Sequence, residues 1–311
     1  MRRDFMKTGI AIVGFACLLS GCGASTNAYG GGSSSPVHPA WWRSAPDSVA
    51  KNVYVTQESG SGAARLFAFG PQNKNNSAPI CTMSAPNGVV DIGADASGDV
   101  YVPDIARGNV RIIAPNCGAV IGRIHDQFGG PIGVVVQPPA IYIADGSGVD
   151  VCSRSGCTSH LTDPSIVQLS SAAADGLGDV WGAGYGSSGI SLVVWQNAKM
   201  PGHVVSGYIE SDTPGDIMFD NTGDLVTVDS HFGQAYRFKC QLVYFACTQL
   251  VKINLHGASN FGALNGANSD IQVTDFQNSS VDVYSYPNFR YEYSYDAGFN
   301  GDAVEGIAQV P

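Results

Sequence analysis

A short motif that recurs along the chain limits the folds open to this sequence more than any other feature. The motif is an acidic residue, two spacers, a Gly and an Asp, and it occurs at residues 95–99, 175–179 and 220–224. Its first Asp can accept hydrogen bonds from turn amides, and its Gly can adopt the positive φ that a bulged turn needs. Each copy therefore predicts a reversal between two antiparallel strands.

Segments of alternating apolar residues recur at a nearly constant interval. They start at residues 53, 100, 141, 180, 225 and 271. An interval of about 40 residues is typical of propeller blades, because four short strands and their turns need about that much chain. Six such units account for nearly all of residues 51–311.

The first and last strands of the repeat region complement each other. Residues 306–310 have the pattern of a first strand without a successor, whereas the strand that starts at Val53 is a second strand without a predecessor. Placing the C-terminal strand innermost in the first blade closes the ring and removes two unpaired edges. We therefore predict an all-β fold, a six-bladed β-propeller closed by the C-terminal strand, with a seven-bladed ring as the alternative.

The repeats in residues 51–311 resemble those of NHL-type and YncE-like β-propellers. The 39 Gly residues in 311 and the 14% of charged residues suit such a tightly turned all-β domain. The resemblance implies a fold and leaves the function open, because this architecture occurs in lyases, lactonases, receptors and scaffolds.

The N-terminal residues have the features of an export signal. Arg2, Arg3 and Lys7 precede an apolar run at residues 9–19, which is too short to span a bilayer. The run ends in Leu-Ser-Gly-Cys, which resembles the lipobox of bacterial lipoproteins, where the Cys is acylated and the bond before it is cut. The resemblance predicts a lipoprotein signal peptide at residues 1–21 and lipidation of Cys22.

Three further segments follow the signal. Residues 22–35 are small and polar and predict a flexible tether. Residues 36–50 contain two Trp and predict a lead-in segment that packs on the first blade, and residues 51–311 form the propeller. Residues 2–7 also resemble the twin-arginine motif of proteins exported in the folded state, with general secretion as the other route.

Cysteine positions indicate an oxidising compartment. Cys152 with Cys157, and Cys240 with Cys247, flank short turns where facing residues of a hairpin come within bridging distance. Pairing these two sets leaves Cys81 with Cys117 in adjoining blades. Disulfides favour general secretion over export of a domain folded in a reducing cytosol.

The charge of the chain restricts its partners. Without Arg2, Arg3, Lys7 and Asp4, which belong to the signal, 13 basic residues face 25 acidic ones. Such a surface should repel nucleic acid and anionic lipid. We therefore expect a monomer that contacts the membrane through its N-terminal lipid, faces the periplasm or the cell surface, and has an envelope protein or a glycan as its partner.

Four carboxylates end second strands at the same level of the predicted ring: Asp104, Asp145, Asp229 and Asp275. Carboxylates at a channel mouth can bind a hard cation such as calcium. The alternative is that each Asp caps its own turn. His231, two residues after Asp229, suggests a base with its orienting carboxylate, or else a solvent-exposed loop His.

The sequence favours a binding or scaffolding module of the cell envelope and assigns no cofactor and no catalytic residue. The alternative is a hydrolase or lyase with a site at the channel mouth near Asp229 and His231, and a third option is an envelope structural protein without a ligand. Convergent polar groups would favour an enzyme, and dispersed turn-capping groups a module. The Tyr-rich residues 283–295 offer stacking surface for a partner or, alternatively, pack within the sheet.

Overall fold

A computed structural model describes residues 51–58, 64–71, 73–208, 214–230 and 232–311. The signal peptide, tether and lead-in segment predicted for residues 1–50 lie outside this part of the chain. Within the described ranges, no helix has the length and apolar character needed to cross a membrane.

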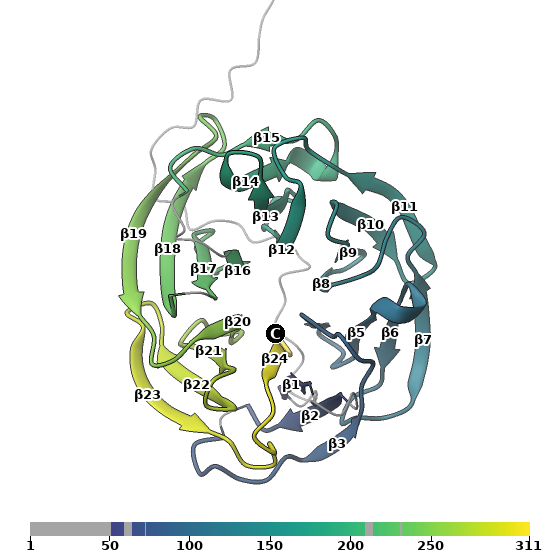
Figure 1. Ribbon diagram of the computed structural model, residues 1–311, viewed down its shortest axis with the longest axis vertical. Helices are drawn as coiled ribbons and strands as arrows, with labels where there is room; N and C mark the ends of the chain where they lie inside the picture. The colour runs from purple at the N-terminus through teal and green to yellow at the C-terminus, as the bar shows by residue number, and fades with distance from the viewer. Residues whose placement is uncertain (1–50, 59–63, 72, 209–213, 231) are drawn as a thin grey trace, which may run out of the picture. The chain divides into compact units, whose positions relative to one another are not determined.

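Six antiparallel four-stranded sheets are arranged in a ring, one sheet per blade (Figure 1). From the centre outwards, blade 1 contains β24 (Val304–Gln309), β1 (Val53–Gln57), β2 (Arg65–Phe69) and β3 (Cys81–Ser84). Blade 2 contains β4 (Gly93–Ala94), β5 (Val100–Asp104), β6 (Asn109–Ile113) and β7 (Val120–His125). Blade 3 contains β8 (Gly133–Gln137), β9 (Ala140–Ala144), β10 (Val149–Ser153) and β11 (Gly156–Leu161).

The second half of the ring has the same arrangement. Blade 4 contains β12 (Gln168–Ala174), β13 (Val180–Gly186), β14 (Gly189–Trp195) and β15 (His203–Val204). Blade 5 contains β16 (Pro214–Phe219), β17 (Leu225–Asp229), β18 (Gln234–Gln241) and β19 (Ala246–Asn254). Blade 6 contains β20 (Ser259–Leu264), β21 (Asp270–Asp275), β22 (Ser280–Ser285) and β23 (Arg290–Tyr295). Two single-turn 3-10 helices, Ile105–Arg107 and Gln196–Ala198, lie in loops. The six-bladed prediction is confirmed.

The recurring acidic motif forms the turn between the first and second strands of a blade. In blade 2, Asp95 Oδ1 accepts hydrogen bonds from the amides of Ser97 (2.9 Å) and Asp99 (3.1 Å). Gly98 has a φ of 84°, a conformation that favours Gly. The other oxygen, Oδ2, accepts from the hydroxyl of Tyr101 at 3.1 Å. The predicted turn chemistry is therefore confirmed.

The same turn links neighbouring blades. Arg154, in the β10–β11 turn of blade 3, donates to Asp95 Oδ2 at 2.9 Å and also binds Asp99 of blade 2. Asp220 Oδ2, in the equivalent turn of blade 5, accepts from the hydroxyl of Tyr286 in blade 6. One carboxylate thus organises its own turn and also holds the adjacent sheet.

The hydrophobic core consists of clusters that each lie between two adjacent blades. Val53 and Val55 pack against blade 6, whereas Tyr54, which points to the opposite face of β1, packs against blade 2. The other adjacent pairs are packed in the same way. Full burial of a large apolar side chain contributes about 1.5–3 kcal/mol. Each blade therefore needs both of its neighbours to keep its two faces out of water.

The C-terminal strand closes the ring, as predicted. β24 pairs antiparallel with β1, so that Val53 faces Gln309 and Val55 faces Ile307. Ile307 is buried against blade 6 and Val310 against blade 2. Strands from the two ends of the repeat region thus form the inner half of one sheet.

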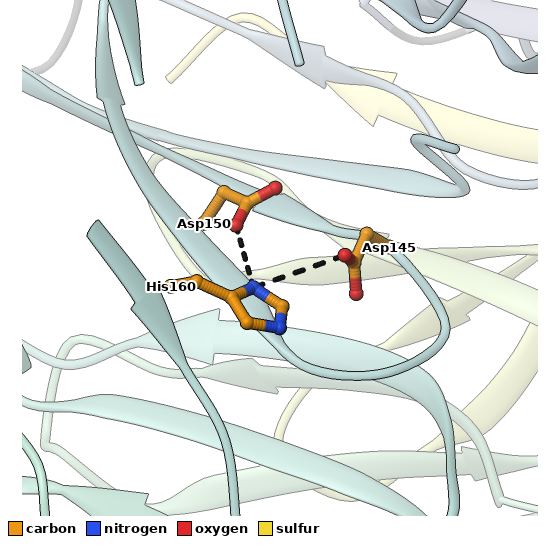
Figure 2. Close-up of side chains that lie close together, drawn as sticks. All are labelled: Asp145, Asp150 and His160. Atoms are coloured by element: carbon orange, nitrogen blue, oxygen red, sulfur yellow. Dashed lines mark hydrogen bonds and ion pairs between the residues drawn. The ribbon is translucent and has the colours of Figure 1, made fainter. Parts of the chain in front are cut away.

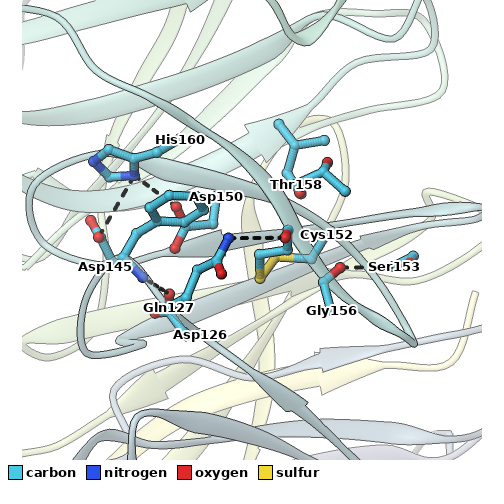
Figure 3. Close-up of a disulfide and its surroundings, with 12 residues drawn as sticks. Asp126, Gln127, Asp145, Asp150, Cys152, Ser153, Gly156, Thr158 and His160 are labelled. Atoms are coloured by element: carbon cyan, nitrogen blue, oxygen red, sulfur yellow. Dashed lines mark hydrogen bonds and ion pairs between the residues drawn. A yellow bond between two sulfur atoms is a disulfide. The ribbon is translucent and has the colours of Figure 1, made fainter.

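Three disulfides lie in the described part of the chain, and they join the pairs that the sequence favoured. Cys81 of β3 and Cys117 of the β6–β7 turn connect blades 1 and 2. Cys152 pairs with Cys157 across β10 and β11, where the two residues face each other (Figure 3). In the same way, Cys240 pairs with Cys247 across β18 and β19. Disulfides are typical of extracellular or periplasmic proteins.

We predict that deleting residues 305–311 opens the ring. The deletion removes most of β24 and with it the buried Ile307 and Val310, and it exposes the edge of β1. Because loss of a large core side chain costs about 2–5 kcal/mol, the Tm should fall by roughly 10 °C or more and the protein should aggregate. Circular dichroism melts and size-exclusion chromatography measure both effects. Removal of Pro311 alone is the control, and similar melting of the 305–311 deletion and the full-length protein would contradict closure by β24.

Candidate functional site

The innermost strands of the blades surround a central channel with small and apolar walls. Every blade contributes to the lining. Examples, in order from blade 1 to blade 6, are Ala308, Gly93, Val135, Ala173, Ile217 and Gly262. Where these strands end, the channel leads to a cavity of about 190 Å³ lined by groups such as Val136, Phe219 and Pro311. The channel therefore has room for a small, partly apolar molecule.

Two carboxyl groups lie at the opposite end, where the innermost strands begin. Asp91 lies two residues before β4 of blade 2, and Asp216 lies on β16 of blade 5, the blade opposite in the ring (Figure 1). Asp216 is 6% exposed, and it accepts hydrogen bonds from the Ser171 hydroxyl at 2.8 Å and the Gly262 amide at 3.2 Å. Asp216 thereby connects blades 4, 5 and 6.

The surroundings of these two groups favour their protonated forms. Asp91 is partly open to the channel but enclosed by protein, and this burial raises its pKa well above the usual range, with a further contribution from the charge of Asp216. Burial raises the pKa of Asp216 to about 6, against the opposing effect of hydrogen bonds from Ser171, Gly262 and Ile217. In its protonated form, Asp91 can act as a hydrogen-bond donor.

A third carboxyl group occupies the same end of the innermost strands. Glu305 of β24 accepts a hydrogen bond from the side-chain amide of Asn260 of β20 at 3.1 Å. Burial raises the pKa of Glu305, and the hydrogen bond from Asn260 opposes this rise. Lys, Arg and His are absent among the described residues that line the channel. This end therefore suits an uncharged or cationic ligand better than an anionic one.

The four carboxylates predicted at one level are each engaged within their own blade. Asp229 accepts from the Phe232 amide at 3.1 Å, and Asp275 accepts from the amides of Gln277 (3.0 Å) and Asn278 (3.1 Å). These contacts are turn caps. They account for the recurrence of Asp at this position without a shared ligand.

The remaining predicted residues, Asp104, Asp145 and His231, are in different surroundings or outside the described part of the chain. Asp104 binds Arg107 and Arg111, and hydrogen bonds from these two residues lower its pKa although burial acts to raise it. Asp145 caps its turn and also faces His160 (Figure 2). His231 lies outside the described residues. In the described part of the chain, the predicted carboxylates do not meet as one group of potential metal ligands.

In the Tyr-rich hairpin, β22 is largely buried, whereas the outer strand β23 is mostly exposed. Tyr284, Tyr286 and Tyr295 are buried, and the Tyr295 hydroxyl donates to Gln272 at 2.8 Å. Tyr291 is 37% exposed and stacks on His256. A partner would therefore meet mainly the Tyr291 side of this hairpin.

Asp91 and Asp216 were not singled out from the sequence. The sequence feature that could have pointed to them is a carboxylate in or just before an apolar innermost strand. A charged group costs free energy there unless it is paired or protonated. Their convergence on the channel depends on ring closure, because the two residues are far apart in sequence.

Comparisons with known proteins place the chain in a structural class. No family model and no curated protein matches its sequence. Among solved structures, the nidogen/laminin complex has a TM-score of 0.67 at 14% identity and covers 84% of this chain and 98% of that one. Streptogramin B lyase has a TM-score of 0.53 at 10% identity, covering 80% and 75%. The calcium-binding protein regucalcin from Agrobacterium tumefaciens has a TM-score of 0.57 at 14% identity, covering 73% and 80%.

At these identities the likeness shows the fold alone. The chain has a six-bladed β-propeller fold. Because the similar structures include an enzyme, a calcium-binding protein and a protein complex, the fold leaves several functions open.

We predict that Asp91→Asn makes stability less sensitive to pH. Above about pH 4 the unfolded chain releases the Asp91 proton while the folded protein keeps it, so rising pH favours unfolding of the wild type. Asn has no proton that titrates in this pH range, so this pH dependence is absent in the variant. Between pH 4 and pH 7, the Tm of the variant relative to wild type should therefore rise, by roughly 2–4 °C for each 1 kcal/mol. Thermal melts across this range measure the effect, and parallel Tm curves for the two proteins would contradict it.

Proposed function

We propose that the protein is an exported, lipid-anchored β-propeller that acts as a binding or scaffolding module of the cell envelope. The lipobox-like residues 19–22 support anchoring through Cys22. The three disulfides support an oxidising location. An acidic domain gains little from anionic lipid, so the acyl chains would hold it at the membrane.

One observation favours a binding or scaffolding module over an enzyme. The carboxylates that end the second strands of the blades are used as turn caps or ion pairs, as Asp229, Asp275 and Asp104 show. A catalytic site needs polar groups that converge on a reacting atom. Groups committed to separate turns instead give a rigid ring whose loops and outer strands can bind a protein or a glycan.

A channel-mouth reaction is the second candidate, and a specific observation favours it. Burial beside a channel with apolar walls raises the pKa of Asp91 well above its usual range, which favours the protonated state that a general acid requires. Streptogramin B lyase shares the fold at 10% identity. In this alternative, Asp91 would act together with Asp216, in place of the pair Asp229 and His231.

We predict that Cys22→Ala releases the protein from the membrane fraction. The substitution removes the residue that would carry the acyl chains. Fractionation followed by immunoblotting should then find the variant in the soluble envelope fraction and the wild type in the membrane pellet. Cys17→Ala, which changes a Cys within the apolar run, is the matched control and should pellet like wild type. A Cys22→Ala protein that still pellets would show that lipid anchoring is wrong.

Affinity capture from the protein's own solubilised envelope separates the two candidate functions. If the protein is a binding module, wild type and Asp91→Asn should recover the same protein or glycan. Tyr291→Ala should recover less of it if the exposed side of the Tyr-rich hairpin takes part in binding. Conversion of a small molecule by wild type that is lost in Asp91→Asn and Asp216→Asn would instead establish the enzyme.

A further inference from the structure

Blade 3 departs from blade 2 at one position of the repeat. In blade 2, Arg111 of β6 faces Val102 of β5 and forms an ion pair with Asp104 at the end of that strand. In blade 3, the residue that faces Ile143 in the same register is Asp150. A positive charge in blade 2 is therefore replaced by a negative charge in blade 3, next to a second carboxylate.

Asp150 lies in a compact group of potential metal ligands (Figure 2). Asp145 comes from the β9–β10 turn, Asp150 from β10 and His160 from β11. His160 Nδ1 is 2.7 Å from Asp150 Oδ1 and 3.8 Å from Asp145 Oδ2. One donor atom from each residue lies within 4.8 Å of the other two. This spacing would allow one ion to contact all three.

A fourth carboxylate reaches the group from the β7–β8 connection (Figure 3). Asp126 is 4% exposed, and its Oδ1 accepts from the amides of Phe128 (3.0 Å) and Gly129 (3.3 Å). Its Oδ2 is buried and has no hydrogen-bond donor, and the same is true of Oδ2 of the fully buried Asp150. Asp126 is one of the groups that interact with Asp150. Buried acceptors without a donor need a proton or a cation nearby.

Few positively charged groups lie near these carboxylates. Among the described residues, the ion pairs of Asp145 and Asp150 are with His160, and no ion pair is formed by Asp126. Buried carboxylates of this kind are costly unless they are paired or coordinate a metal.

The side chains of the group are held in place by their surroundings. Asp145 Oδ1 accepts from the amides of Ser147 (2.8 Å) and Gly148 (2.7 Å). His160 Nε2 lies 3.3 Å from the Ser147 hydroxyl, and its ring stacks on Phe128. At the far end of the same hairpin, the Cys152–Cys157 disulfide joins β10 and β11 (Figure 3). Fixed ligands of this kind favour metal binding because little order is lost when the ion arrives.

We propose that Asp126, Asp145, Asp150 and His160 form a binding site for a divalent cation of the Zn²⁺ or Mn²⁺ class. An imidazole nitrogen combined with carboxylate oxygens suits these ions, whereas Ca²⁺ takes six to eight oxygen ligands. The ion would supply the charge that Arg111 supplies in blade 2. It would also join the β7–β8 connection to the β9–β10 turn and to strands β10 and β11 of blade 3, so that its role is structural and separate from the channel.

Metal binding to the mature protein tests the proposal. After treatment with a chelator, the protein is titrated with Zn²⁺, Mn²⁺ or Ca²⁺ in a calorimeter, and metal content is measured by mass spectrometry. We expect one equivalent of Zn²⁺ or Mn²⁺ and, at about 100 times the Kd, a rise in Tm of roughly 5 °C or more. Asp150→Asn and the milder His160→Gln should abolish both effects, with circular dichroism to show that each variant folds.

The matched control is Asp282→Asn in blade 6. Asp282 holds the same register position as Asp150, but it faces Ser294 where Asp150 faces His160. This variant should keep the metal-dependent rise in Tm. Wild-type protein that binds neither Zn²⁺ nor Mn²⁺ stoichiometrically would overturn the proposal in favour of a proton shared by Asp126 and Asp150. Tighter binding of Ca²⁺, or full binding by both site variants, would overturn it as well.

Discussion

The pairing of β24 with β1 is the interaction on which the rest of the molecule depends. Each blade has two apolar faces, and each face is buried only by the adjacent blade. In an open ring, the faces that carry Val53 and Ile307 on one side and Phe261 on the other would lose their partners. The channel would also lose one wall, since Ala308 of β24 lines it. The geometry that brings Asp91 towards Asp216 across the ring thus follows from backbone pairing in blade 1.

The acidic composition of the chain is largely explained by internal uses of Asp. Asp95 and Asp220 close turns and then bind donors that lie on the next blade, such as Arg154 and Tyr286. Exposed ion pairs contribute little to stability, and Arg154 is about half exposed, so the buried contact of Asp220 with Tyr286 contributes more. Acidic residues in this fold therefore act chiefly as hydrogen-bond acceptors for backbone and phenol groups.

The sequence allowed prediction of the features that depend on local periodicity. The blade count and ring closure follow from strand spacing. The acidic turns follow from local residues such as Gly98, whose positive φ belongs to the turn in which it lies. The sites were harder to predict, because Asp91 and Asp216 meet only through the curvature of the ring. Asp145 was predicted as one of four equivalent carboxylates. Its difference from Asp229 comes from Asp150 and His160, whose registers on β10 and β11 the repeat pattern alone does not give.

The place of β24 in chain order has a consequence for how the protein matures. The innermost position of blade 1 belongs to the strand that is synthesised after all the others, so β1 waits for its partner until the whole repeat region has been made. The ring cannot close before β24 is available to pair with β1. Completion of β24 thus sets the moment of folding, and a chain that stops before β24 keeps an open sheet edge that proteases can recognise.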